Sequence, residues 1–178
     1  MAKSKKPAKK SPRKRASAGK RSASGRGAPA DAVALLKADH RQVKEWFDEF
    51  EKSRSDTKKG ELARKVCQAL KVHTQIEEEI FYPAFLQATE DMDTHHEAEI
   101  EHEGAKRLIA DIEASGPSDD YFDAKVKVLS EMIKHHVKEE EQRGGMFAEA
   151  RQSSMDLKAV GVELASRKTA LMQLSADS

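Results

Sequence analysis

The chain changes abruptly from small and basic residues to a helical apolar pattern near residue 31. Residues 1–30 hold no side chain more apolar than Ala or Pro, apart from Met1, so we expect this segment to be disordered. From Asp31, a predicted N-cap, core-type positions recur at alternating steps of three and four. They are Val33, Leu36, His40, Val43, Phe47 and Phe50. This spacing predicts an amphipathic helix that ends before the turn-forming residues 53–60.

Three further stripes with the same spacing follow, separated by turn-forming segments. The second covers residues 62–84, and Pro83 is expected to kink or loosen its last turn. The third covers residues 98–112 and stops before a Gly-Pro pair at 116–117. The fourth covers residues 122–140. Four helices with short connections predict an all-α, up-down-up-down four-helix bundle.

A weaker amphipathic segment over residues 156–174 predicts a short C-terminal helix that either packs across the bundle or stays loosely attached. The pattern therefore divides the chain into three parts. Residues 1–30 form a disordered Lys/Arg-rich tail, residues 31–150 the four-helix domain, and residues 151–178 the C-terminal amphipathic helix.

Charge separates the tail from the domain. Residues 1–30 carry 11 Lys/Arg and no Asp/Glu, whereas the rest carries 21 Lys/Arg and 31 Asp/Glu. A tail of charge +11 can neutralise several phosphates, so non-specific DNA binding is one expectation and a solubilising extension is the other. With one cysteine no intrachain disulfide forms, and no apolar run reaches the ~20 residues that span a membrane. A cytoplasmic, or nucleoid-associated, protein with no membrane partner is expected.

Each of the four stripes carries one histidine near its middle. These are His40, His73, His102 and His136. Two of them are followed four residues later by glutamate, Glu77 and Glu140, which places each pair on one helix face. Counted from the common end of the bundle, three of these positions lie at similar heights. The fourth does so if its helix continues past Gly144-Gly145 to about Arg151, with a bulge at the glycines, and we expect this continuation.

These histidines and glutamates would be costly in an apolar interior unless cations compensate their charge. A pair of metal ions does so and uses the imidazole lone pairs directly. Four imidazoles and two carboxylates without thiolates suit iron, with zinc or manganese as alternatives. Glu78 and Glu79 fall off the stripe and are expected in solvent, as are His96 and His135. His95 is expected at the surface or a helix end, and Trp46, Cys67 and Tyr82 in packing roles.

Four segments resemble the hemerythrin-like HHE cation-binding family over about residues 31–150. They are Asp39-His40, HTQIEEEIFYP, EAEIEHEGAKRLI and HHVKEEE. The resemblance implies a non-haem di-iron centre with His40, His73, His102 and His136 as terminal ligands and Glu77 and Glu140 as bridges. Oxygen-carrying hemerythrins have one more histidine on the third helix. Its absence leaves more coordination positions open, so simple reversible oxygen carriage is not implied.

The leading hypothesis is a di-iron protein that handles oxygen, peroxide, nitric oxide or iron itself, in sensing, storage or detoxification. A peroxidase or oxidase using the same centre is the enzyme alternative, and a DNA-associated protein using residues 1–30 is the third. The chain offers no separate nucleophile or dedicated general acid. A metal- or oxygen-binding protein is therefore preferred over a dedicated enzyme. The physiological ligand and the oligomeric state stay open.

Overall fold

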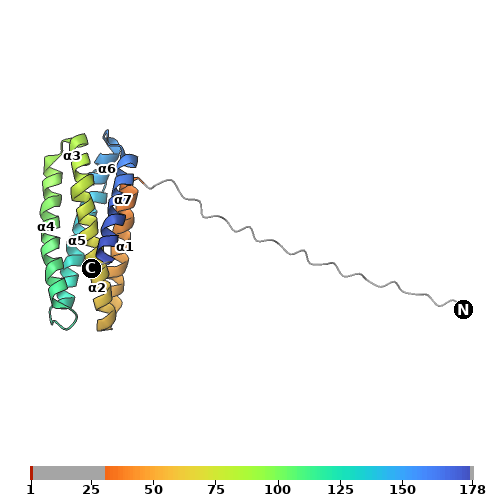
Figure 1. Cartoon of the computed structure of the whole chain (residues 1–178), viewed down its shortest axis with the longest axis vertical. Coiled ribbons are helices and arrows are strands. Elements are labelled where there is room, and N and C mark those ends of the chain that lie inside the picture. The colour runs from red at the N-terminus through yellow and green to blue at the C-terminus, as the bar shows by residue number, and fades with distance from the viewer. Residues whose placement is uncertain (2–30, 177–178) are drawn as a thin grey trace.

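The computed structural model describes residue 1 and residues 31–176, and the predicted tail lies outside the described residues. The described part is a bundle of long helices with shorter ones at one end (Figure 1). Its elements are α1 (Ala32–Lys52), α2 (Asp56–Ile76), η1 (Glu77–Phe81), α3 (Tyr82–Thr89), α4 (Met92–Ser115), α5 (Phe122–Glu141), α6 (Met146–Gln152) and α7 (Leu157–Ala176). The up-down-up-down bundle of α1, α2, α4 and α5 confirms the predicted fold class.

Side-chain caps begin three of the long helices where the sequence offers an Asp or Ser. The predicted N-cap Asp31 accepts a hydrogen bond of 2.8 Å from the Ala34 N–H. Ser55 caps α2 and Asp91 caps α4 in the same way. Each cap satisfies a backbone donor that the first turn leaves without a helical partner. The bundle therefore has well-defined helix starts that fix the heights of its side chains.

The second long helix widens into a π-helical turn, η1, before Pro83. The Tyr82 N–H bonds the Glu77 carbonyl five residues back. Pro83 has no N–H, and its ring would clash with the carbonyl four residues earlier in a regular α-helix. The wider turn relieves that conflict, so the helix continues through α3 to Thr89. The predicted loosening at Pro83 thus lies in the turn before the proline and begins at Glu77.

The prediction that the fourth helix continues to about Arg151 is wrong. α5 ends at Glu141, and Gly144 adopts a positive φ of 80° that turns the chain away from the helix axis. A side chain on Gly145 would lie 2.0 Å from the Glu139 carbonyl oxygen, so this close approach requires glycine. The chain then forms α6, whose Met146 and Phe147 are buried. The short helix α6 therefore covers the end of the bundle, where a continuation of α5 was predicted.

Two apolar clusters divide the core, and the histidine layer lies between them. One cluster includes Val43 and Leu70, and the other includes Leu36 and Ile76. Along α1 and α2 the clusters thus lie on opposite sides of the stripe histidines. Burial of apolar side chains above and below holds the helices around this polar layer.

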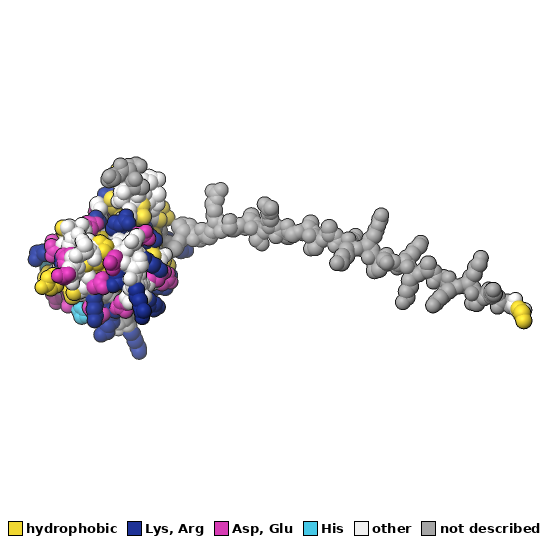
Figure 2. All heavy atoms as spheres, turned by 90° about the horizontal axis from the view of Figure 1, so that it is seen from below, with side chains coloured by type: hydrophobic (Ala, Val, Ile, Leu, Met, Phe, Trp, Pro, Cys, Tyr) yellow, Lys and Arg dark blue, Asp and Glu magenta, His cyan; other side chains and the backbone are white. Residues whose placement is uncertain are grey.

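The C-terminal helix α7 packs across α1, α2 and η1 (Figure 1). Leu164 and Leu171 are buried on its inner side. Arg167 pairs with Glu79, and Lys168 pairs with Asp39. Acidic and basic side chains are interspersed on the face seen from below (Figure 2). Among residues 31–176, no helix combines the length and apolar character needed to cross a bilayer.

Candidate metal centre

The structure brings the four predicted histidines together as two pairs. Nε2 of His40 lies 3.0 Å from Nε2 of His73, which joins α1 and α2. Nε2 of His102 lies 3.3 Å from Nε2 of His136, which joins α4 and α5. All four side chains are buried. Four separate helices therefore direct one imidazole nitrogen each toward the middle of the bundle.

The two predicted glutamates each lie between the pairs. Oε2 of Glu77 lies 3.2 Å from His73 Nε2 and 3.5 Å from His102 Nε2. On the other side, Glu140 Oε2 lies 3.3 Å from His40 Nε2 and 3.6 Å from His136 Nε2. Each carboxylate thus contacts one imidazole of either pair, as a bridge between two ions requires.

The burial of these carboxylates is extreme. Glu77 is 0% exposed and Glu140 is 2% exposed. Among the described residues, none of their four oxygens has a hydrogen-bond partner. An unsatisfied buried acceptor costs about 1–3 kcal/mol, so this arrangement is unfavourable for the protein on its own. It fits two metal ions, because cations would satisfy the oxygens that the protein leaves bare.

Glu140 is buried although its helix, α5, ends one residue later at Glu141. Glu140 lies in the last turn of α5, and the turn at Gly144 brings α6 back over it. Phe147 of α6 stacks on the His40 ring at a centroid distance of 5.7 Å. The aromatic ring therefore covers the side of the histidine layer that the shortened α5 leaves open.

Electrostatics keep a proton on two of the imidazoles, those of His73 and His136, in the metal-free protein. Burial alone would lower the pKa of His73, but Glu77 and Asp39 raise it to about 10. Burial would also lower the pKa of His136, but Glu140 and Glu101 raise it to about 9. Burial and the neighbouring His73 lower the pKa of His40 to about 4. Protons thus compensate the carboxylates where cations would.

The pKa values of the two central carboxylates, Glu77 and Glu140, move in opposite directions. Burial and the neighbouring Glu77 raise the pKa of Glu140. Burial would raise that of Glu77 too, but the nearby histidines, chiefly His73, lower it. Groups whose environments perturb their pKa values this strongly mark functional sites more often than structural ones.

An outer carboxylate faces the Nδ1 atom of every histidine in the centre. Glu141 Oε1 lies 2.8 Å from His40 Nδ1, and Glu78 Oε1 lies 2.9 Å from His102 Nδ1. The other two contacts are Glu101 Oε2 to His136 Nδ1 at 2.8 Å and Asp39 Oδ2 to His73 Nδ1 at 3.5 Å. These carboxylates orient the rings so that Nε2 points inward.

Sequence reasoning missed these outer carboxylates, although a signal for them exists. Each one directly precedes or follows a residue of the centre in the sequence, but it contacts the histidine of a different helix. The four links run from Asp39 to His73, from Glu78 to His102, from Glu101 to His136 and from Glu141 to His40. They form a closed ring around the bundle. The expectation that Glu78 is solvated was therefore wrong, whereas Glu79 pairs with Arg167 at the surface.

Other residues weighed from the sequence have clear places. Tyr82 is buried, and its hydroxyl lies 3.1 Å from His102 Nε2, so it contacts the centre as well as packing. His95 is half-buried against the Tyr82 ring, and Trp46 packs against the core. Cys67 is a buried packing residue, and burial raises the pKa of its thiol to about 12. His135 is exposed, as expected.

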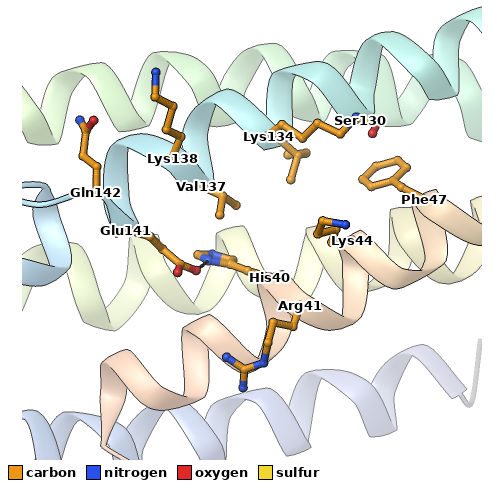
Figure 3. A pocket seen from close by; sticks show the side chains of 11 residues that line it. His40, Arg41, Lys44, Phe47, Ser130, Lys134, Val137, Lys138, Glu141 and Gln142 are labelled. Carbon is orange, nitrogen blue, oxygen red and sulfur yellow. Dashed lines mark hydrogen bonds and ion pairs between the residues drawn. The ribbon is translucent and has the colours of Figure 1, made fainter.

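A groove of about 500 Å³ between α1 and α5 leads from the surface to His40 (Figure 3). Val137 and Phe47 give it apolar walls, and Arg41 and Lys138 extend on opposite sides of it (Figure 3). Lys44 and Lys134 also line it. The groove is large enough for a small molecule to reach the edge of the centre.

Comparison with known proteins agrees with this geometry. The hemerythrin HHE cation binding domain profile matches residues 31–144. The chain belongs to this family. Its helical bundle is therefore a cation-binding domain, which the resemblance in the sequence had implied. The fold also matches the crystal structure of a hemerythrin HHE cation binding domain-containing protein from Mycobacterium kansasii, with a TM-score of 0.66 and 19% identity over 80% of this chain and 87% of that one.

One curated relative of this HHE protein has a name that does not mention the HHE domain. It is a DNA nickase from Nostoc sp., 31% identical over 107 residues. The match covers 60% of this chain but only 30% of the relative. The likeness thus concerns a minor part of that protein.

Proposed function

We propose that this HHE protein is a non-haem di-iron protein that handles a small ligand such as oxygen, peroxide or nitric oxide, or iron itself. The observation that carries the proposal is the pair of buried glutamates, each set between the two histidine pairs with no hydrogen-bond partner among the described residues. The mixed nitrogen and oxygen donor set suits iron, with zinc or manganese as alternatives.

The number of donors supports binding of an external ligand. His40 and His73 would hold one ion, His102 and His136 the other, and both carboxylates would be shared. Each ion then receives four protein donors, whereas iron commonly takes five or six ligands, so positions remain for a small molecule. Iron would supply electron exchange with that molecule. The groove between α1 and α5 gives it a route to the His40 side.

Elemental analysis with optical spectroscopy on protein purified without added metal tests this function. We expect about two irons per chain and an absorption band from oxygen-to-iron charge transfer. His136→Ala should lower the iron content to one or fewer, because it removes a donor of one ion. His96→Ala removes an imidazole from the surface of α4 and should leave the content unchanged. Two irons bound equally by His136→Ala would refute the proposal.

The Tyr82 hydroxyl favours a peroxidase or oxidase as the second candidate. It is a buried O–H group in contact with an imidazole of the centre, where it can donate a proton or hydrogen bond to a bound small molecule. Peroxide consumption in excess of the iron present would distinguish turnover from simple binding. We expect Glu77→Ala to abolish it and Tyr82→Phe to slow it with the iron content unchanged. Consumption that survives Glu77→Ala would exclude this candidate.

The basic segment favours a third candidate, DNA association. Residues 1–30 carry +11 and no acidic residue, and a relative that matches over 107 residues is named a DNA nickase. Contacts to phosphates alone would make the binding salt-sensitive and independent of sequence. Deleting residues 1–30 should abolish a gel shift seen at low salt and leave the metal content intact. If the full chain gives no shift at low salt, this candidate fails.

A further inference from the structure

The fourth-helix motif HHVKEEE contains the His-x3-Glu spacing twice. His136 and Glu140 point into the centre, whereas His135 and Glu139, one residue earlier, lie together at the surface of α5. We propose that His135, Glu139 and Glu101 form a separate outer site that takes up a divalent transition-metal cation and passes it to the buried pair. The inference rests on the proposed metal centre.

The outer site has the donor geometry of a cation site. His135 Nε2 lies 3.2 Å from Glu139 Oε1 and 3.4 Å from Glu101 Oε1. One donor atom from each of the three residues lies within 4.8 Å of the others. Two carboxylates and one imidazole are donors that suit Fe²⁺, Mn²⁺ or Zn²⁺. With three protein ligands and water for the rest, the site would hold a cation more weakly than the centre, as a transfer site must.

Glu101 connects the two sites through its two oxygens. Oε1 faces the outer site, and Oε2 lies 2.8 Å from Nδ1 of His136 in the centre. The same carboxylate thus orients a histidine of the buried pair and offers a ligand at the surface. A cation at the outer site would therefore share a carboxylate with the Nδ1 side of His136, whose Nε2 faces the centre.

A cavity lies between the outer site and the buried centre. It has a volume of about 90 Å³ and lies between α4 and α5, lined by Glu101 and His135 at the outer site and by His102 and His136 of the centre. A water molecule needs only ~10–15 Å³ of such space, so the volume admits a small ion, which would pass the apolar side chains of Ala105, Met132 and Ile133 before it reaches the imidazoles. The outer site therefore opens toward the histidine pair that the ion would join.

Charge distinguishes this route from the groove on the other side of α5. The groove is lined by four basic residues, Arg41, Lys44, Lys134 and Lys138, and by one acidic residue, Glu141 (Figure 3), so its lining has a net positive charge that disfavours cations. The α4–α5 side presents Glu101 and Glu139 instead. Fields of this kind raise or lower the local concentration of an ion at an entrance. The cation and the small ligand would thus use different entrances.

Cobalt(II) binding to the metal-free full-length protein tests the inference, because this ion is coloured and stable in air. We expect the wild type to bind two ions tightly and a third one weakly. His135→Ala and Glu139→Gln should remove the third and slow the filling of the first two about tenfold or more, while two tight ions are still reached. Glu139→Lys should slow filling further.

His96→Ala is the matched control, since it removes an imidazole from the separate cluster of His95, His96 and Glu99 on α4. Unchanged filling rates in the His135 and Glu139 variants, or an equal effect of His96→Ala, would overturn the outer site. If the wild type binds no tight pair at all, the proposed metal centre fails first. A tight pair that fills at one rate in every variant would refute only the transfer site.

Discussion

Replacing Glu140 by leucine should stabilise the metal-free protein and remove its response to metal. Glu140 sits in the last turn of α5, covered by α6, and among the described residues neither of its oxygens has a hydrogen-bond partner. Its two imidazole neighbours keep other partners after the change, because His40 retains Glu141 and His136 retains Glu101. The substitution therefore removes two buried oxygens that lack hydrogen-bond partners, and it leaves each neighbouring imidazole with a carboxylate partner.

The magnitude follows from these contacts. Two unsatisfied buried oxygens cost about 2–6 kcal/mol together. Attraction to His40 and His136, at 3.3 and 3.6 Å, offsets part of that cost in the metal-free state. Replacing a whole buried ion pair by apolar residues commonly stabilises by about 1–4 kcal/mol, whereas removing one partner destabilises when the other charge is left alone. Here both imidazole neighbours keep a second carboxylate, so we expect a gain in unfolding free energy of about 2 kcal/mol. For a domain of this size, that raises the Tm by about 4–8 °C.

Thermal unfolding followed by circular dichroism, with chelator and with added Fe²⁺ under nitrogen, measures both effects. The wild type should gain Tm on adding metal, because binding to the folded state alone stabilises it. Without metal, the Glu140→Leu variant should have a higher Tm than the wild type, and adding metal should raise that Tm only a little. Glu163→Leu, an exposed glutamate on α7, is the control and should change stability by less than ~0.5 kcal/mol. The reasoning would be refuted if metal-free Glu140→Leu had a lower Tm than the wild type and gained as much Tm on adding metal. That result would show that no cation binds at Glu140.

Three further outcomes follow from the same structure. Glu141→Ala removes the carboxylate that contacts His40 Nδ1 and orients its ring. It should weaken metal binding about 10–100-fold in a chelator competition and leave the helical circular dichroism spectrum unchanged. The Cys67 thiol should react with Ellman's reagent at pH 8 only after unfolding, since it is buried and its pKa is raised to about 12. The raised pKa values of His73, about 10, and His136, about 9, stabilise the metal-free fold fully below about pH 6.5, so denaturant titrations should show stability falling from there to about pH 10. Metal-loaded protein should lack that decline.

The helical periodicity was sufficient to predict the bundle and the convergence of its polar layer. A stripe that is apolar except for one histidine at mid-height can only direct that histidine inward, and four such stripes meet. The six side chains lie together although the predicted continuation of the fourth helix is wrong. Glu140 needs only the last turn of α5 for its place, and Phe147 supplies the cover that extra helix was expected to give.

The outer carboxylates could not be predicted from one helix at a time. Glu78 lies off the stripe of its own helix, and that position predicts solvent exposure. It contacts His102 because α4 packs beside η1, and the π turn that begins at Glu77 rotates the following residues relative to a regular helix. Such contacts depend on the rotation of neighbouring helices, which periodicity within a single helix does not determine.

The unfavourable groups of this protein are confined to one layer of the bundle. Apolar clusters on both sides of that layer hold the helices together, and the Nδ1 atoms of the histidines face carboxylates near the surface. Protons on His73 and His136 compensate the glutamates in the metal-free protein, and cations would replace those protons. Cations that bind in this buried layer would need an entrance. The acidic side of α4 and α5 meets that need better than the basic groove.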